Sequence, residues 1–183
     1  SAPPATAISV VDALGTLKFS SPLCLRTPPG EAKRLFVCEK GGKLKVVPDV
    51  TAATPIASVV MDLSSVVVTD SECGLLSVAF HPDFSTNRYL YIFYSHSIGG
   101  LHQRVSRFTM SAGNPNLVEA GSELILIDQA DDASNHNGGD MHFGADGYLY
   151  ISVGDEGNGN DSLNNSQRID NDIFSAMLRI DVD

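Results

Sequence analysis

Alternation of apolar and polar positions runs through most of the chain and predicts β-strands. It is clearest at residues 34–39, 89–94 and 148–153, which are rich in the aromatic and β-branched side chains that strands favour. A turn-forming string precedes each segment: Pro-Pro-Gly, His-Pro-Asp and Ala-Asp-Gly. The best helical candidate, Ser166 to Phe174, is short and polar, so the pattern predicts an all-β fold.

The three segments belong to one repeated unit, in which an apolar strand, a turn and an aromatic strand are followed by a further strand. Leu35, Leu90 and Leu149 occupy equivalent places, 55 and 59 residues apart. A period of this size holding about four strands is typical of a β-propeller blade, whereas a meandering sandwich would not repeat at a near-constant step. We predict about three propeller blades in residues 22–183, preceded by an N-terminal segment and first strand in residues 1–21.

Composition narrows the class of protein. With 183 residues and a hydrophobic fraction of 43%, the chain can bury a sizeable core. It has 12 Lys and Arg against 22 Asp and Glu, a net charge of −10, which repels a phosphate backbone, so no nucleic-acid partner is expected. The most apolar stretch, Ile56 to Val68, is interrupted by Asp62 and is shorter than a membrane span, so none is expected.

Two of the three cysteines are expected to face each other. Cys24 and Cys38 lie at equal distances from a turn centred near Glu31, which places them opposite one another on neighbouring strands. Facing residues form a disulfide in favourable geometry, and the alternative is two small apolar residues on one face. Cys73 is left without a partner. The chain lacks a C-x-x-C motif, which argues against zinc-ribbon, thioredoxin-like and c-type haem sites.

A polar, glycine-bearing loop at residues 131–140 leads directly into a predicted strand. Loops at strand ends are where propeller sites gather around the central channel. His136 stands there between Asn135 and Asn137, and an imidazole can act as a general base near neutral pH. The alternative is a solvated or hydrogen-bonded turn residue.

A second polar loop, residues 155–161, concentrates carboxylates and amides among glycines. Oxygen-rich loops can hold Ca²⁺, and Asp155 and Asp161 are the candidate ligands. The alternative is a solvated loop with Asx-turns.

Glu72 precedes an apolar strand and is expected to reach the same end of the channel as His136. Taken alone, it is equally a surface or strand-entry carboxylate. His81 is interpreted as part of the His-Pro-Asp turn. His96 and His102 are interpreted as loop residues, and no role is assigned to these three histidines.

Three strings together carry a family resemblance: residues 72–84, residues 136–150 followed by Gly154-Asp155, and residues 177–183. In this order and spacing they resemble the soluble quinoprotein glucose/sorbosone dehydrogenases, which are PQQ-dependent sugar dehydrogenases built as six-bladed propellers. The resemblance extends from about residue 22 to residue 183.

The resemblance implies that an aldose is oxidised at its C1 hydroxyl to the lactone, with hydride transfer to PQQ. His136 occupies the position of the base that removes the hydroxyl proton, and Asn135 and Glu72 occupy positions beside the quinone site. The resemblance further implies Ca²⁺ as a second cofactor and a periplasmic or secreted location. Because the family's other PQQ and Ca²⁺ ligands come from later blades, the isolated 183-residue chain is expected to be inactive.

An alternative is a non-catalytic binding module, because the string from residue 74 to residue 82 also resembles the propeller of hedgehog-interacting protein. A shared fold does not carry an activity with it. Three blades leave exposed sheet edges, so a homodimer that closes the propeller is a further expectation.

Overall fold

The computed structural model describes residues 9–166, 168, 170 and 172–183, and these residues form three antiparallel sheets. The first sheet contains β1 (Pro22–Arg26), β2 (Leu35–Glu39), β3 (Lys43–Val47) and β4 (Ser58–Asp62). The second contains β5 (Leu75–Phe80), β6 (Tyr89–His96), β7 (His102–Thr109) and β8 (Leu124–Ala130). The third contains β9 (Gly138–Phe143), β10 (Leu149–Val153) and β11 (Met177–Ile180).

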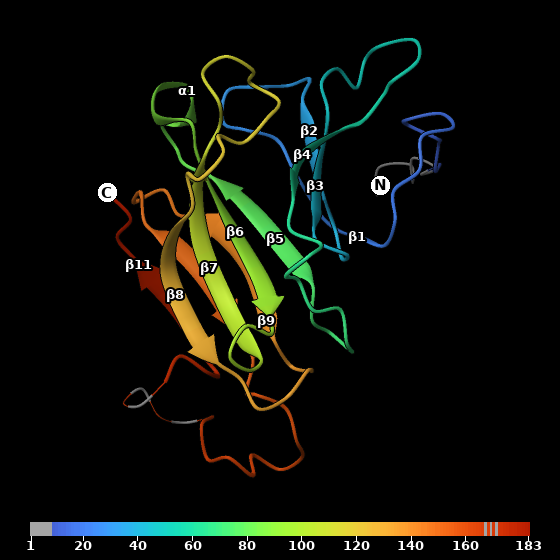
Figure 1. Ribbon diagram of the computed structural model, residues 1–183. Helices are drawn as coiled ribbons and strands as arrows, with labels where there is room; N and C mark the ends of the chain where they lie inside the picture. The colour runs from blue at the N-terminus through green and yellow to red at the C-terminus, as the bar shows by residue number, and fades with distance from the viewer. Residues whose placement is uncertain (1–8, 167, 169, 171) are drawn as a thin grey trace, which may run out of the picture.

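Each sheet is a meander in which sequence neighbours pair, as expected for a propeller blade. The first strands of the three sheets lie next to one another, because β5 contacts both β1 and β9. The second sheet therefore lies between the other two (Figure 1). The three meander sheets are blades of a β-propeller, and because they do not close into a ring, they form only part of one. The predicted all-β class is confirmed.

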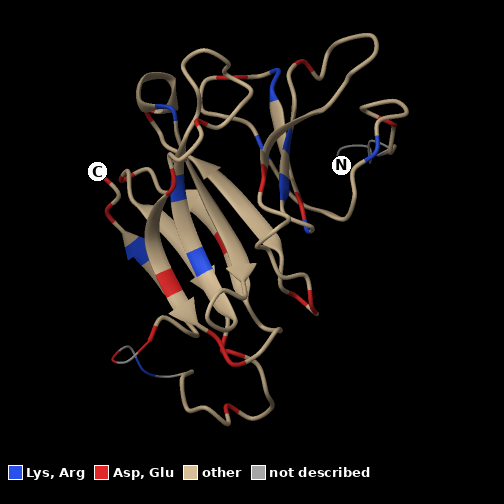
Figure 2. Ribbon diagram, viewed as in Figure 1, with Lys and Arg blue, Asp and Glu red and all other residues tan. Residues whose placement is uncertain are grey.

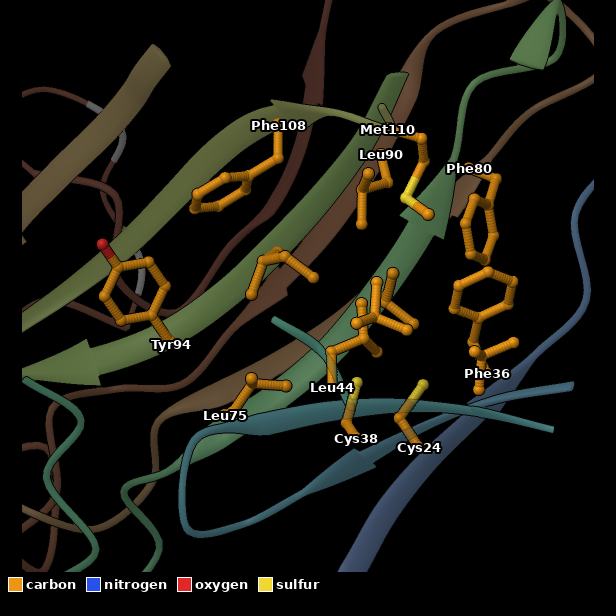
Figure 3. Close-up of a cluster of buried hydrophobic side chains, with 14 of the residues drawn as sticks. Cys24, Phe36, Cys38, Leu44, Leu75, Phe80, Leu90, Tyr94, Phe108 and Met110 are labelled. Atoms are coloured by element: carbon orange, nitrogen blue, oxygen red, sulfur yellow. The ribbon is translucent and has the colours of Figure 1, made fainter. Parts of the chain in front are cut away.

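The middle blade explains why the aromatic strand at residues 89–94 is so apolar. In β6, Leu90, Ile92 and Tyr94 face a core shared with the first sheet (Figure 3), whereas Tyr91 and Phe93 face a core shared with the third sheet. Successive side chains of a strand point to opposite faces, so a sheet covered on both sides must be apolar at every position. All but the first residue of β6 is accordingly buried.

The cysteine register agrees with the prediction, since Cys24 and Cys38 are Cα partners between β1 and β2. All three cysteines are free thiols and are buried. His81 makes the predicted turn contact, its Nδ1 accepting a hydrogen bond from the Asp83 amide at 3.0 Å.

Other expectations differ from the structure. A short helix, α1 (Phe84–Asn87), follows the His-Pro-Asp turn, where the sequence indicated only a turn. The described residues of the segment 166–174 contain no helix, although residues 167, 169 and 171 lie outside the described part. A first strand was expected in residues 1–21; residues 9–21 contain none, residues 1–8 are not described, and β1 begins at Pro22.

Among the described residues, no helix has the length and apolar character needed to cross a membrane. Acidic residues colour several loops at the lower end of the sheets in Figure 2, where the loops after β8 and β10 lie.

Candidate functional site

A large cavity lies where the first strands of the three sheets meet. Its volume is about 710 Å³, within the range of small-molecule sites. Segments of β1, β5 and β9 form its wall together with the loops before β3 and β5. The lining residues are Leu23, Cys24, Leu25, Arg26, Lys40, Ser71, Glu72, Leu76, Gly138, Gly139 and Asp140.

Two cationic and two anionic side chains line this cavity. The Arg26 guanidinium donates to Asp140 Oδ1 at 2.6 Å and lies 2.9 Å from His142 Nε2, so it links β1 to β9. Arg26 Nε is buried and has no hydrogen-bond partner among the described residues. Lys40 Nζ donates to the Ser71 carbonyl at 2.6 Å. Arg26 was not predicted from the sequence as a site residue. The signal that could have identified it is a cationic residue on the first strand of a blade.

Glu72 and His136 are in contact in the structure. Both residues were expected from the sequence at the same end of the channel. The backbone amide of His136 donates to Glu72 Oε2 at 2.6 Å, and the Glu72 amide donates to the Ser134 carbonyl at 2.9 Å. His136 has a φ of 58°, a left-handed conformation that costs free energy for a non-glycine residue. The two hydrogen bonds stabilise this turn and hold it against the loop before β5.

The His136 side chain is oriented by a carboxylate. Its Nδ1 lies 2.7 Å from Asp155 Oδ1, which makes Nε2 the free nitrogen of the ring. The side chain is 47% exposed, so Nε2 is accessible to a small molecule. The hydrogen bond with His136 lowers the pKa of Asp155 from its ordinary value, keeping this partner ionised. The sequence assigned Asp155 to a calcium loop and did not predict this contact.

The backbone after His136 is tightly packed. Gly138 has a φ of 71°, and a Cβ there would lie 2.8 Å from the carbonyl oxygen of Ser152, so only glycine is accommodated. Asn137 is buried; its Nδ2 lies 3.3 Å from Cys73 Sγ. Its Oδ1 has no partner in the described part of the chain. The loop is thus fixed to both neighbouring blades.

Asn135 and the predicted calcium ligands are placed separately. Asn135 packs against Gly157, where a Cβ would meet Asn135 Oδ1 at 2.6 Å, and it does not line the cavity. Asp161 Oδ1 accepts the amides of Asn165 and Ser166 at 3.1 and 3.2 Å. These carboxylates thus have local partners, and a Ca²⁺ site in this loop stays a prediction.

His96 and His102, which were expected in loops, instead end β6 and begin β7. They form a further histidine–carboxylate cluster at the turn of this hairpin. His96 and His102 are opposite residues, and both lie close to Asp128 Oδ1, at 3.0 and 3.1 Å. It is the one arrangement of metal-ligand type among the described residues. However, the Ile98 amide donates to His96 Nδ1 at 3.1 Å, so the ring proton is on Nε2 and is donated to Asp128. A metal would need that nitrogen free, and the cluster is a hydrogen-bonded network.

Comparison with known proteins identifies several relatives. Human hedgehog-interacting protein is 32% identical over 182 residues, covering 87% of this chain and 25% of that protein. The HIPL2 protein of Arabidopsis thaliana is 26% identical over 197 residues, covering 85% of this chain and 28% of that protein. The chain therefore spans about a quarter of the length of these relatives.

Solved structures share the fold. The PQQ-bound aldose sugar dehydrogenase of Streptomyces coelicolor superposes with a TM-score of 0.75 at 22% identity, over 98% of this chain and 50% of that one. The soluble aldose sugar dehydrogenase of Escherichia coli gives 0.69 at 22% identity, over 88% of this chain and 44% of that one. The family described as Glucose / Sorbosone dehydrogenase matches residues 19–183. This chain belongs to the glucose/sorbosone dehydrogenase family.

Proposed function

We propose that these residues form part of a PQQ-dependent sugar dehydrogenase that oxidises the C1 hydroxyl of an aldose to the lactone, with His136 as the base. The observation that carries the proposal is the oriented imidazole: His136 Nδ1 is held by Asp155 at 2.7 Å, and its Nε2 has no hydrogen-bond partner among the described residues. His136 does not itself line the cavity, but its backbone amide is bound by Glu72, which does. A base must be both oriented and accessible to take a proton from a hydroxyl.

Three residues of the chain have separate roles in the proposed proton transfer. His136 Nε2 accepts the hydroxyl proton, and the Asp155 carboxylate stabilises the imidazolium that results, because its lowered pKa keeps it ionised. Glu72 accepts the His136 amide and so fixes the backbone that carries the base. When bound, PQQ supplies the two-electron acceptor that the side chains cannot provide.

The cavity is large enough for a small-molecule cofactor, and its wall carries cationic groups that can bind carboxylates. Arg26 and Lys40 offer two cationic groups on its wall, and the buried Arg26 Nε has an unused donor. These residues would hold carboxylate groups of PQQ. Asn135 and Glu72 beside the quinone, and Ca²⁺ as second cofactor, stay predictions taken from the family.

The test is reconstitution with PQQ and Ca²⁺, followed by dye-linked aldose oxidation. We expect turnover from the whole polypeptide that contains these residues, and none from the isolated 183 residues, because the solved enzymes that share the fold are about twice as long. Saturable PQQ binding, followed by absorbance, is measured alongside. A whole polypeptide that binds PQQ without oxidising any aldose would refute the enzymatic proposal.

A non-catalytic binding propeller is the second candidate. It is favoured by the 32% identity with hedgehog-interacting protein, which exceeds the 22% identity with the aldose sugar dehydrogenases quoted above. The two candidates differ in PQQ binding, because a binding module has no need of the cofactor. If the chain is a binding module that uses other surfaces, substitution of Arg26 and Lys40 should not change its affinity for the partner.

Homodimer closure and a periplasmic or secreted location also stay predictions. Light scattering that gives the mass of a single chain would contradict closure by a second copy.

A further inference from the structure

Two cysteine thiols face each other beside the candidate cavity, and one of them, Cys24, lines its wall. Cys24 of β1 and Cys38 of β2 are direct Cα partners, and opposed residues in antiparallel strands have Cα atoms about 4.5–5.5 Å apart. That spacing falls within the range a disulfide requires. Figure 3 shows both side chains pointing into the same apolar cluster, with their sulfur atoms side by side.

The two thiols differ in exposure and in protonation. Cys24 is 6% exposed and lines the cavity, whereas Cys38 is fully buried. The contact with the Cys38 thiol, with smaller contributions from the Val78 backbone and Arg26, lowers the pKa of Cys24 to about 6 against the effects of burial and of Asp140. Burial and the adjacent Cys24 raise the pKa of Cys38. Cys24 is therefore the more acidic thiol of the pair and the one that lines the cavity.

We propose that Cys24 and Cys38 form a dithiol site that reacts with small-molecule disulfides and closes into a disulfide between β1 and β2. The register places the second sulfur within reach, and the cavity gives a small reagent access to the first. Cys73 is buried beside Asn137, on the loop before β5, and takes no part.

The exchange proceeds in two balanced steps. The Cys24 thiolate attacks one sulfur of the reagent, forming a mixed disulfide and releasing one thiolate. Cys38 then loses its proton to solvent and attacks the Cys24 sulfur, forming the protein disulfide and releasing the second thiolate. Starting from the Cys24 thiolate, the protein loses two electrons and one proton, and the reagent is reduced to two thiolates, which take up protons from solvent to become thiols.

The test is incubation of the folded chain with oxidised glutathione, followed by thiol counting under denaturing conditions. We expect the free thiols to fall from three to one. Trypsin should then release a linked pair of peptides, because Arg26, Lys33 and Arg34 separate the two cysteines. The oxidised chain should have an unfolding equilibrium constant about a hundredfold lower than the reduced chain.

Matched variants assign the sulfurs. Cys73→Ser should still lose two thiols, whereas Cys38→Ser should stop at one glutathione bound to Cys24. Circular dichroism verifies that each variant is folded, and the wild-type result does not depend on either. Three free thiols at equilibrium, or a glutathione that persists on Cys24 of the wild type, would overturn the proposal.

Discussion

Among the histidines that lie beside a carboxylate, His96 and His136 differ in how many ring nitrogens are engaged. At the β6–β7 hairpin, His96 is buried and donates to Asp128 through Nε2, while its Nδ1 accepts the Ile98 amide. At the cavity's end, His136 uses only Nδ1, toward Asp155, and is 47% exposed.

The comparison shows that a histidine beside a carboxylate is not by itself a sign of catalysis. A ring whose two nitrogens are both engaged holds a hairpin together, since it has no lone pair to offer a substrate. A ring held at one nitrogen, with the other exposed, is oriented and still able to take a proton. His102 Nε2 and His142 Nδ1 also have no hydrogen-bond partner among the described residues. The candidate site is therefore identified by the free nitrogen of His136 together with its contacts to Asp155 and Glu72.

Removal of the exposed imidazole tests this contrast most strongly. In the reconstituted whole polypeptide, His136→Ala is expected to lower kcat by about 10²- to 10⁴-fold, because general-base catalysis contributes that much. PQQ binding, measured by absorbance titration, should persist. His102→Ala is the matched control and should keep wild-type turnover. Equal losses in both variants would show that the contrast between the clusters is false.

Loss of the orienting carboxylate should have a smaller effect. Asp155→Asn is expected to lower kcat by about 10- to 100-fold, because the imidazole loses the partner that fixes its tautomer and stabilises its protonated form. In ¹⁵N NMR spectra, the ring-nitrogen signals of His136 should indicate a mixture of the two tautomers. Unchanged turnover together with an unchanged tautomer would mean that the Asp155 contact is incidental.

The buried cluster should affect stability and not catalysis. Burial alone would raise the pKa of Asp128, but hydrogen bonds from Arg104 and His96 outweigh it and lower that pKa from 3.8 to about 2. The ionised carboxylate therefore stabilises the fold above about pH 4, and the stabilisation is lost as pH falls toward about 2. Because the side chain is 32% exposed, the net contribution is about 1 kcal/mol.

Asp128→Asn measures that contribution. Urea unfolding should show the variant less stable than wild type by about 1 kcal/mol at pH 7, with a smaller difference near pH 3. A difference that is the same at both pH values would contradict the assigned ionisation.

The smallest effect is expected at His102. Its side chain is 24% exposed and stacks on His96, so His102→Ala should lower the free energy of unfolding by about 0.5 kcal/mol. A loss above about 2 kcal/mol in urea unfolding would mean that the network depends on this residue more than its exposure implies.

Much of the fold was predictable because strand alternation is a local signal. The predicted segments at residues 34–39, 89–94 and 148–153 became β2, β6 and β10. The Cys24–Cys38 register was also predictable, since a hairpin turn determines which residues pair. The helix α1 was missed because four residues are too few for a helical period.

The candidate site was predictable only in part. The strings around Glu72 and His136 indicated both residues, but they are 64 positions apart in sequence, and only the packing of β5 beside β9 brings them into contact. The contact of Asp155 with His136 was not predicted, because it depends on how the loop after β10 folds back; the Ca²⁺ role expected for Asp155 stays a prediction. Arg26 was missed for the same reason, since its partner Asp140 belongs to another sheet.

The sequence by itself determined the strands, the blade repeat and the family, because each depends on short-range order and residue type. The tertiary structure decided that Asp155 orients His136, that Glu72 holds the His136 amide and that Arg26 pairs with Asp140. These residues are far apart in sequence, and a hydrogen bond forms only where donor and acceptor atoms approach to within about 3 Å. The sequence alone does not determine which residues the packed sheets and loops bring that close.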